Sequence, residues 1–166
     1  MINWFKKEKS NSLIAVSTGE LSPLSAVPDE AFSSLAIGDG VAITPLKSEV
    51  SSPISGTLSM IFPTKHAFGI TTNDGIEVLI HMGIDTVKLK GKGFKIEKEI
   101  NQQVNAGDVV AKMDLEFIKH HGYNPVIMVI VTNKSCYQFS YEKSGIVTRG
   151  RSVIGKFVLD DKDQKM

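Results

Sequence analysis

Short apolar runs, each bounded by Gly, Pro, Asn, Asp or Ser, recur along the chain from Leu13 onward. Runs of this length that are rich in Val, Ile and Thr predict β-strands. The expected strands are Ile14–Val16, Val41–Thr44, Gly56–Phe62, Phe68–Thr71, Ile76–His81, Val109–Met113, Val126–Thr132, Ile146–Thr148 and Val153–Val158. Because each sheet must bury an apolar face against another layer, the pattern predicts an all-β protein, either a sandwich or a partly closed barrel.

Two segments favour a short helical turn instead of a strand. The first follows Pro28 and runs through Asp29 to Phe32, and the second, 115–120, follows Asp114. Asp is a preferred residue at helix N-caps because its carboxylate accepts hydrogen bonds from backbone N–H groups of the first turn. We therefore expect one or two helical turns among the strands.

The strands 68–71 and 76–81 are separated by residues that favour a turn, Asn73-Asp74-Gly75, and this predicts a β-hairpin. If the loop is centred between Asn73 and Asp74, His66 lies directly opposite His81, and the two imidazoles share one sheet face. A three-residue loop with a glycine bulge would shift this pairing by one residue.

Two converging imidazoles suggest three kinds of role. In the first role, each histidine taken alone is interpreted as an ordinary hydrogen-bonded side chain. As a pair, one neutral ring can attack phosphorus while the other donates hydrogen bonds to the phosphoryl oxygens, with Thr64 orienting the second ring. The same rings, together with Asp85, could instead bind Zn²⁺, although the sequence has no HExxH motif.

Composition narrows the function classes further. The chain has 166 residues, which suits one domain, and 42% of them are hydrophobic, which supports a core. Nineteen basic and eighteen acidic residues give a net charge of +1, so no overall field favours nucleic acid. The single Cys136 excludes an internal disulfide, and no apolar stretch resembles a signal or membrane-spanning segment, so we expect a cytoplasmic protein.

The ends of the chain differ from its centre. We expect residues 1–12 to form a flexible segment in which Trp4 and Phe5, beside three lysines, provide a weak membrane-surface contact or simply a frayed terminus. The tail 160–166 is strongly charged and is expected to be solvated. This leaves 13–159 as the folded domain.

The sequence resembles the glucose-family enzyme IIA component (EIIA) of the bacterial phosphoenolpyruvate-dependent sugar phosphotransferase system. The specific part of the resemblance is His81-Met82-Gly83-Ile84-Asp85-Thr86-Val87. Matching segments, in chain order, include Thr18–Leu21, Val27–Asp29, Phe32, Gly38–Ile43, Ser52–Thr57, Phe62–Phe68, Leu89–Phe94, Val104–Asp108, Met113–Leu115 and Asn124–Asn133. The stretch Lys134–Tyr141 agrees poorly with the family.

The resemblance implies an antiparallel β-sandwich with Greek-key and jelly-roll connections, acting as a phosphocarrier without a cofactor. His81 would accept a phosphoryl group from the carrier protein HPr and pass it to a cysteine of a sugar-specific EIIB domain. His66 would stabilise the phosphoryl group, and Thr64 would hydrogen-bond to His66. Because the resemblance places the acceptor cysteine on EIIB, Cys136 is expected to be a structural or surface thiol.

The resemblance and the apolar residues near the histidines also suggest a partner surface. Acidic rim residues Asp39 and Asp85 would meet basic residues of HPr, although Asp39 between two glycines equally suits a turn. The apolar residues expected around the histidines are Phe62, Phe68, Ile84 and Val87. Two alternatives stay open: a regulatory protein whose partners depend on phosphorylation, and a zinc hydrolase using His66 and His81.

Overall fold

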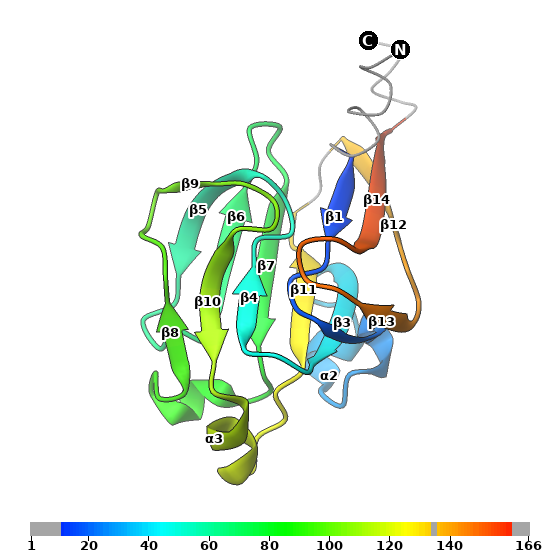
Figure 1. Ribbon diagram of the computed structural model, residues 1–166. Coiled ribbons are helices and arrows are strands. Elements are labelled where there is room, and N and C mark those ends of the chain that lie inside the picture. Colours follow the sequence, from blue (N-terminus) through cyan, green and yellow to red (C-terminus); the bar gives the residue numbers. More distant parts are fainter. Residues whose placement is uncertain (1–10, 134–135, 161–166) are drawn as a thin grey trace.

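The computed structural model describes residues 11–133 and 136–160, which form three antiparallel sheets (Figure 1). The largest sheet has eight strands in the order β13-β2-β3-β11-β7-β6-β5-β9, and the smaller sheets have the orders β4-β10-β8 and β1-β14-β12. The strands are β1 (Ser12–Ile14), β2 (Gly19–Pro23), β3 (Asp39–Pro45), β4 (Glu49–Ser51), β5 (Gly56–Ile61), β6 (Ala67–Thr71), β7 (Glu77–Met82), β8 (Phe94–Ile96), β9 (Gln103–Val104), β10 (Val109–Met113), β11 (Ile127–Val131), β12 (Tyr137–Tyr141), β13 (Gly145–Val147) and β14 (Val153–Leu159). The predicted all-β sandwich is confirmed.

The main core lies between the eight-stranded sheet and the two smaller sheets. Alternation along β7 shows how the sequence specifies this layer: Val78, Ile80 and Met82 are buried in the main core. Glu77, Leu79 and His81 point to the opposite face, because successive side chains of a strand alternate. One face of this strand is therefore wholly apolar and the other is mixed.

A second apolar cluster covers part of the outer face of the large sheet. Its buried members are Leu24, Val27, Phe32, Ala42, Val126, Met128 and Ile130. It lies beneath two short helices, η1 (Leu24–Ala26) and α2 (Glu30–Ser33), and Asp29 caps α2 by accepting a hydrogen bond from the N–H of Ala31 at 3.0 Å. The first predicted helical turn is thus confirmed, and it protects an outer patch of the sheet from water.

The second predicted turn is α3 (Leu115–His120), in which Asp114 accepts from the N–H of Phe117 at 3.1 Å. A further short helix, η2 (Thr86–Leu89), follows β7. Strands β2, β4, β8, β9 and β12 were not predicted as strands. They are short or contain Gly and Pro, and β12 alternates aromatic and polar residues, so their pairing partners rather than their own propensity determine them.

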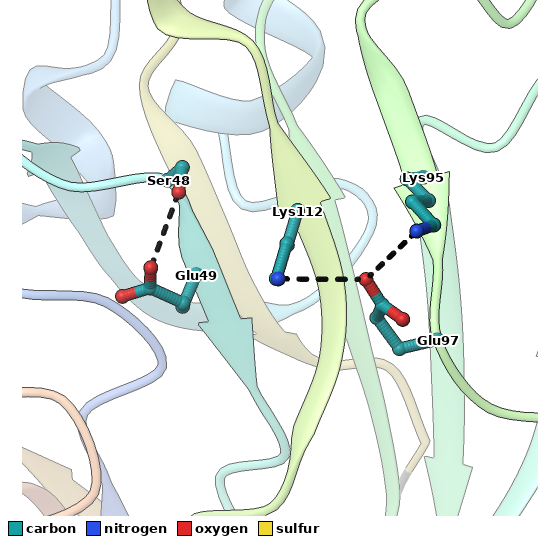
Figure 2. Close-up of polar contacts among 5 residues, drawn as sticks. All are labelled: Ser48, Glu49, Lys95, Glu97 and Lys112. Carbon is teal, nitrogen blue, oxygen red and sulfur yellow. Dashed lines mark hydrogen bonds and ion pairs between the residues drawn. The ribbon is translucent and has the colours of Figure 1, made fainter.

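The outer face of the β4-β10-β8 sheet is polar. The carboxylate of Glu97 forms ion pairs with Lys95 at 3.8 Å and with Lys112 at 3.7 Å. The hydroxyl of Ser48 donates a hydrogen bond to Glu49 (Figure 2). Exposed pairs of this kind contribute little to stability, at most about 1 kcal/mol each. This sheet therefore stabilises the fold through its inner face.

Of the two registers that the sequence leaves open for the β6–β7 hairpin, the structure has the one shifted by one residue. Ala67, not His66, lies opposite His81, and the N–H of Thr72 donates to Ile76 across a three-residue loop. Gly75 has φ +88°, a left-handed conformation that glycine adopts without steric cost. The loop is thus the glycine-bulge alternative, and strand alternation alone cannot bring His66 to the face of His81.

The same register corrects the prediction for Phe68. Phe68 pairs with Ile80, so its ring points into the main core and is 0% exposed. A partner protein cannot reach it, and its role is packing.

The folded part begins slightly before the predicted boundary, because Ser12 already pairs with Lys156 in the β1–β14 ladder. Trp4 and Phe5, as well as the tail after Asp160, lie outside the described residues. Within the described ranges, none of the helices is both long and apolar enough to cross a membrane.

Replacing Phe68 tests its assignment to the core. We expect Phe68→Ala to lower the free energy of unfolding by about 3–5 kcal/mol, because a buried aromatic ring leaves a cavity. Val87→Ala is the control, since Val87 is 49% exposed and its loss should change stability by less than about 0.5 kcal/mol. Urea unfolding measures both, and equal small losses would contradict the assignment.

Candidate functional site

His81 lies near the end of β7 on the outer face of the large sheet. The register places it beside Met128 of β11, which in turn lies beside Ala42 of β3. Both neighbours belong to the second apolar cluster. The side chain of His81 therefore emerges at the border of an apolar surface, and it is only partly buried.

A backbone carbonyl fixes the ring of His81. Its Nδ1 lies 2.9 Å from the carbonyl oxygen of Gly83. Since a carbonyl can only accept, Nδ1 carries the proton and Nε2 keeps its lone pair in the neutral ring. Gly83 has φ +90° and its N–H donates to Val126, so the chain turns sharply at the point where this carbonyl is needed.

His66 reaches His81 from a tight turn before β6. Lys65 adopts φ +61°, its N–H donates to Phe62, and the N–H of Phe62 donates to Ala67. The rings of His66 and His81 lie edge to face, with centroids 4.9 Å apart at 80°. The predicted convergence of the imidazoles is thus present, although a turn produces it rather than cross-strand pairing.

Thr64 engages the second ring. Its hydroxyl oxygen lies 2.7 Å from Nδ1 of His66, whose side chain is almost fully buried. Both histidines therefore have their Nδ1 atoms occupied by hydrogen bonds, which leaves both Nε2 atoms for chemistry.

Burial keeps both rings neutral. Burial lowers the pKa of His66. Burial, and then the proximity of His66, lower the pKa of His81 to about 4, against opposing contributions from the Gly83 carbonyl and the carboxylates of Asp29 and Asp85. At neutral pH His81 thus presents an unprotonated nitrogen.

Two aromatic rings flank the pair. Phe62 packs edge to face on His66 with centroids 5.2 Å apart, and Phe32 of α2 lies 4.9 Å from the ring of His81. Sequence reasoning expected Phe62 here but missed Phe32. The capping motif at Asp29 predicted the turn that carries Phe32, but the packing of that turn over His81 depends on the tertiary fold.

The acidic neighbours of His81 are Asp29 and Asp85. Asp85 is exposed, and its side chain makes no capping bond at η2. The structure does not bring Asp39 to the site: it pairs with Val131, three residues along β11 from the row of His81, or about 10 Å. Asp39 instead bonds its carboxylate to the N–H of Gly40, as a turn residue would, and its carbonyl accepts from Tyr141.

The expected apolar surface is only partly present. Val87 is 49% exposed, and Ile84 is partly buried against the second cluster. A shallow groove of about 380 Å³ also begins at Phe62 and runs over the outer face along Met60 and Leu79. Phe62, which packs on the ring of His66, joins this groove to the histidine pair.

His66 and His81 are the two side chains that could share a metal ion at this site. Within 11–133 and 136–160, no group of three or more His, Cys, Asp or Glu side chains is arranged to hold one. Asp85 therefore does not complete the three-ligand set considered from the sequence, and Cys136 lies directly before β12 rather than in such a group.

The arrangement offers a nucleophilic nitrogen beside a second ring nitrogen that can donate a hydrogen bond. Because the ring centroids lie 4.9 Å apart, a group bonded to Nε2 of His81 would lie close to the ring of His66. Such a pair suits the transfer of an anionic group, because one ring forms the bond and the other stabilises the developing charge.

Comparisons with known proteins show the family of the chain. Residues 11–137 match the family model described as phosphoenolpyruvate-dependent sugar phosphotransferase system, EIIA 1. The structure resembles glucose permease IIA from Mycoplasma capricolum with a TM-score of 0.80 and 38% identity, over 87% of this chain and 93% of that one. The chain therefore belongs to the EIIA 1 family of the phosphoenolpyruvate-dependent sugar phosphotransferase system.

Proposed function

We propose that this protein is a phosphohistidine carrier that receives a phosphoryl group from HPr on His81 and delivers it to a cysteine of an EIIB domain. The observation that carries the proposal is the contact between two neutral imidazoles whose Nδ1 atoms are both hydrogen-bonded. Membership in the family supports the class of partner and of reaction.

In the first step, the lone pair on Nε2 of His81 attacks phosphorus, and the P–N bond of the donor phosphohistidine breaks with its electron pair returning to the donor ring. His81 keeps its Nδ1 proton and becomes a phosphorylated imidazolium. The Gly83 carbonyl stabilises that cation because it accepts the Nδ1 proton's hydrogen bond. In the second step, a cysteine thiolate attacks phosphorus and the pair returns to Nε2.

His66 stabilises the transferring group in both steps. If the hydroxyl of Thr64 donates to Nδ1, Nε2 of His66 carries the proton and points its donor at the phosphoryl oxygens. Charge spreads over those oxygens in the transition state, so a preorganised donor there lowers the barrier.

The surface around the histidines receives the partner proteins. Asp29 and Asp85 supply negative charge beside the transfer site, while Val87, Phe62 and the adjoining groove supply apolar contact. Rim charges mainly set association rates and orientation, so this side of the molecule suits a donor with a basic docking surface.

Replacing each histidine separates the two roles. After incubation with phosphoenolpyruvate, enzyme I and HPr, mass spectrometry should find phosphate on His81 of the wild type and none in His81→Gln. His66→Gln should still accept phosphate but pass it to EIIB about 10²–10³-fold more slowly, because a transition-state donor is lost. His120→Gln, an exposed histidine of α3, is the control. An unlabelled His81, or full transfer by His66→Gln, would reject the assigned roles.

The lowered pKa predicts an unusual pH dependence. A ring with the ordinary pKa of about 6.5 loses its free base as the pH falls from 7.5 to 5.5. His81, with a pKa of about 4, stays unprotonated over this range, so its rate of phosphorylation should hold constant relative to the donor's own reactivity. The chemical donor phosphoramidate measures this, with free imidazole under the same conditions as the reference. A tenfold fall parallel to imidazole would contradict it.

Neutralising the acidic neighbours tests the docking surface. Asn can cap α2 as Asp does, and it tolerates the left-handed conformation of Asp85 (φ +59°), so Asp29→Asn and Asp85→Asn remove charge with little change in structure. We expect each to slow association with HPr several-fold at low salt and to have little effect at 1 M salt, because salt screens the attraction. Stopped-flow kinetics measures this. Glu142→Gln is the control, and an equal loss there would point to net charge alone.

A further inference from the structure

Thr86 is a buried polar residue that the proposed reaction does not use. It begins η2, its side chain is 0% exposed, and its Oγ1 donates a hydrogen bond of 2.6 Å to the carbonyl of Met82. The hydrogen bonds observed for the two histidine rings go to Thr64 and to the carbonyl of Gly83, not to Thr86.

The residue that Thr86 holds connects the two histidines. Met82 lies between His81 and Gly83 in the chain, and its N–H donates to the carbonyl of His66 at 2.7 Å. The backbone of Met82 is therefore bonded on one side to the residue that carries the second imidazole and on the other side to the hydroxyl of Thr86.

Thr86 also packs against the peptide that orients His81. A Cβ on Gly83 would lie 2.4 Å from Cγ2 of Thr86, so the threonine methyl occupies the space that a side chain at position 83 would fill. The carbonyl of Gly83 holds Nδ1 of His81. A shift of Thr86 would thus change the direction of that carbonyl and the proton position on His81.

We propose that Thr86 is a positioning residue for phosphoryl transfer, whose hydroxyl fixes the Met82–Gly83 backbone and thereby the ring orientation of His81 and its separation from His66. The role rests on the proposed function of His81, since it matters only if that ring accepts phosphate. Partners that orient a metal-bound histidine through its second ring nitrogen typically change affinity or activity about 10- to 100-fold when replaced, and we expect the lower end of this range for Thr86, which acts through the backbone.

Two substitutions separate the hydroxyl from the methyl. Thr86→Val keeps the shape and loses the donor, whereas Thr86→Ser keeps the donor and loses the methyl. We expect Thr86→Val to lower the single-turnover rate from saturating phospho-HPr about tenfold with unchanged affinity for HPr. In ¹⁵N NMR spectra of the unphosphorylated protein, the share of His81 protonated on Nδ1 should fall. Thr86→Ser should keep both the wild-type transfer rate and the wild-type tautomer of His81.

Ser52 provides a matched control. It is also 0% exposed, and its hydroxyl donates a 2.6 Å hydrogen bond to a backbone carbonyl, that of Ile54, beyond the end of β4. Ser52→Ala should lower the thermal midpoint without changing the tautomer of His81 or the rate. Thermal unfolding of all variants separates loss of stability from loss of positioning.

The outcomes distinguish this inference from the function on which it rests. Wild-type protein that never acquires phosphate on His81 would overturn the proposed function, whereas the NMR measurement would still report on Thr86. An unchanged His81 tautomer in Thr86→Val, or a loss in Thr86→Ser equal to that in Thr86→Val, would overturn the positioning role. If Thr86→Val does not fold, Thr86→Ser still tests the positioning role. A changed tautomer of His81 and a lower rate in Thr86→Ser would overturn that role.

Discussion

The site depends on two imidazole rings that are buried next to each other. A charged ring costs free energy when it is desolvated, and two charged rings with centroids 4.9 Å apart would also repel each other. Both effects act in the same direction, so His66 and His81 stay neutral at the pH at which most proteins work. Neutrality is what the proposed function requires of His81, because only an unprotonated nitrogen can form a bond to phosphorus.

Irregular backbone, rather than regular strand, makes the pair possible. The left-handed residues Lys65 and Gly83 lie next to the two histidines in space, and Asp85, also left-handed, starts the helix that follows. The regular ladders of β6 and β7 supply a rigid base on which these turns are built. The proposed carrier role would need this combination, since the accepting ring must be reachable by large partners yet keep a fixed geometry.

Much of the architecture could be predicted from sequence because it follows from local rules. Alternation gave the faces of β7, and the capping motifs at Asp29 and Asp114 gave both α-helices. The errors concern features that local rules do not determine. The sequence left two hairpin registers open, and the one adopted, with a three-residue glycine loop, turns Phe68 into the core and leaves His66 to reach His81 through a turn. The contact of Phe32 with His81, and the distance of Asp39 from it, depend on which strands become neighbours.

The pairing of β1 with β14 has a consequence for how the protein can be attached to others. Ser12 and Phe157, near the two ends of the folded part, line a common hollow with Asn73 and Asp74 at the tip of the β6–β7 hairpin. His81 occupies the opposite end of that hairpin (Figure 1). A segment that continues from Ser12 or Phe157 therefore leaves the described fold at the end remote from His81, and under the proposed function the histidine face would stay accessible to one partner after another.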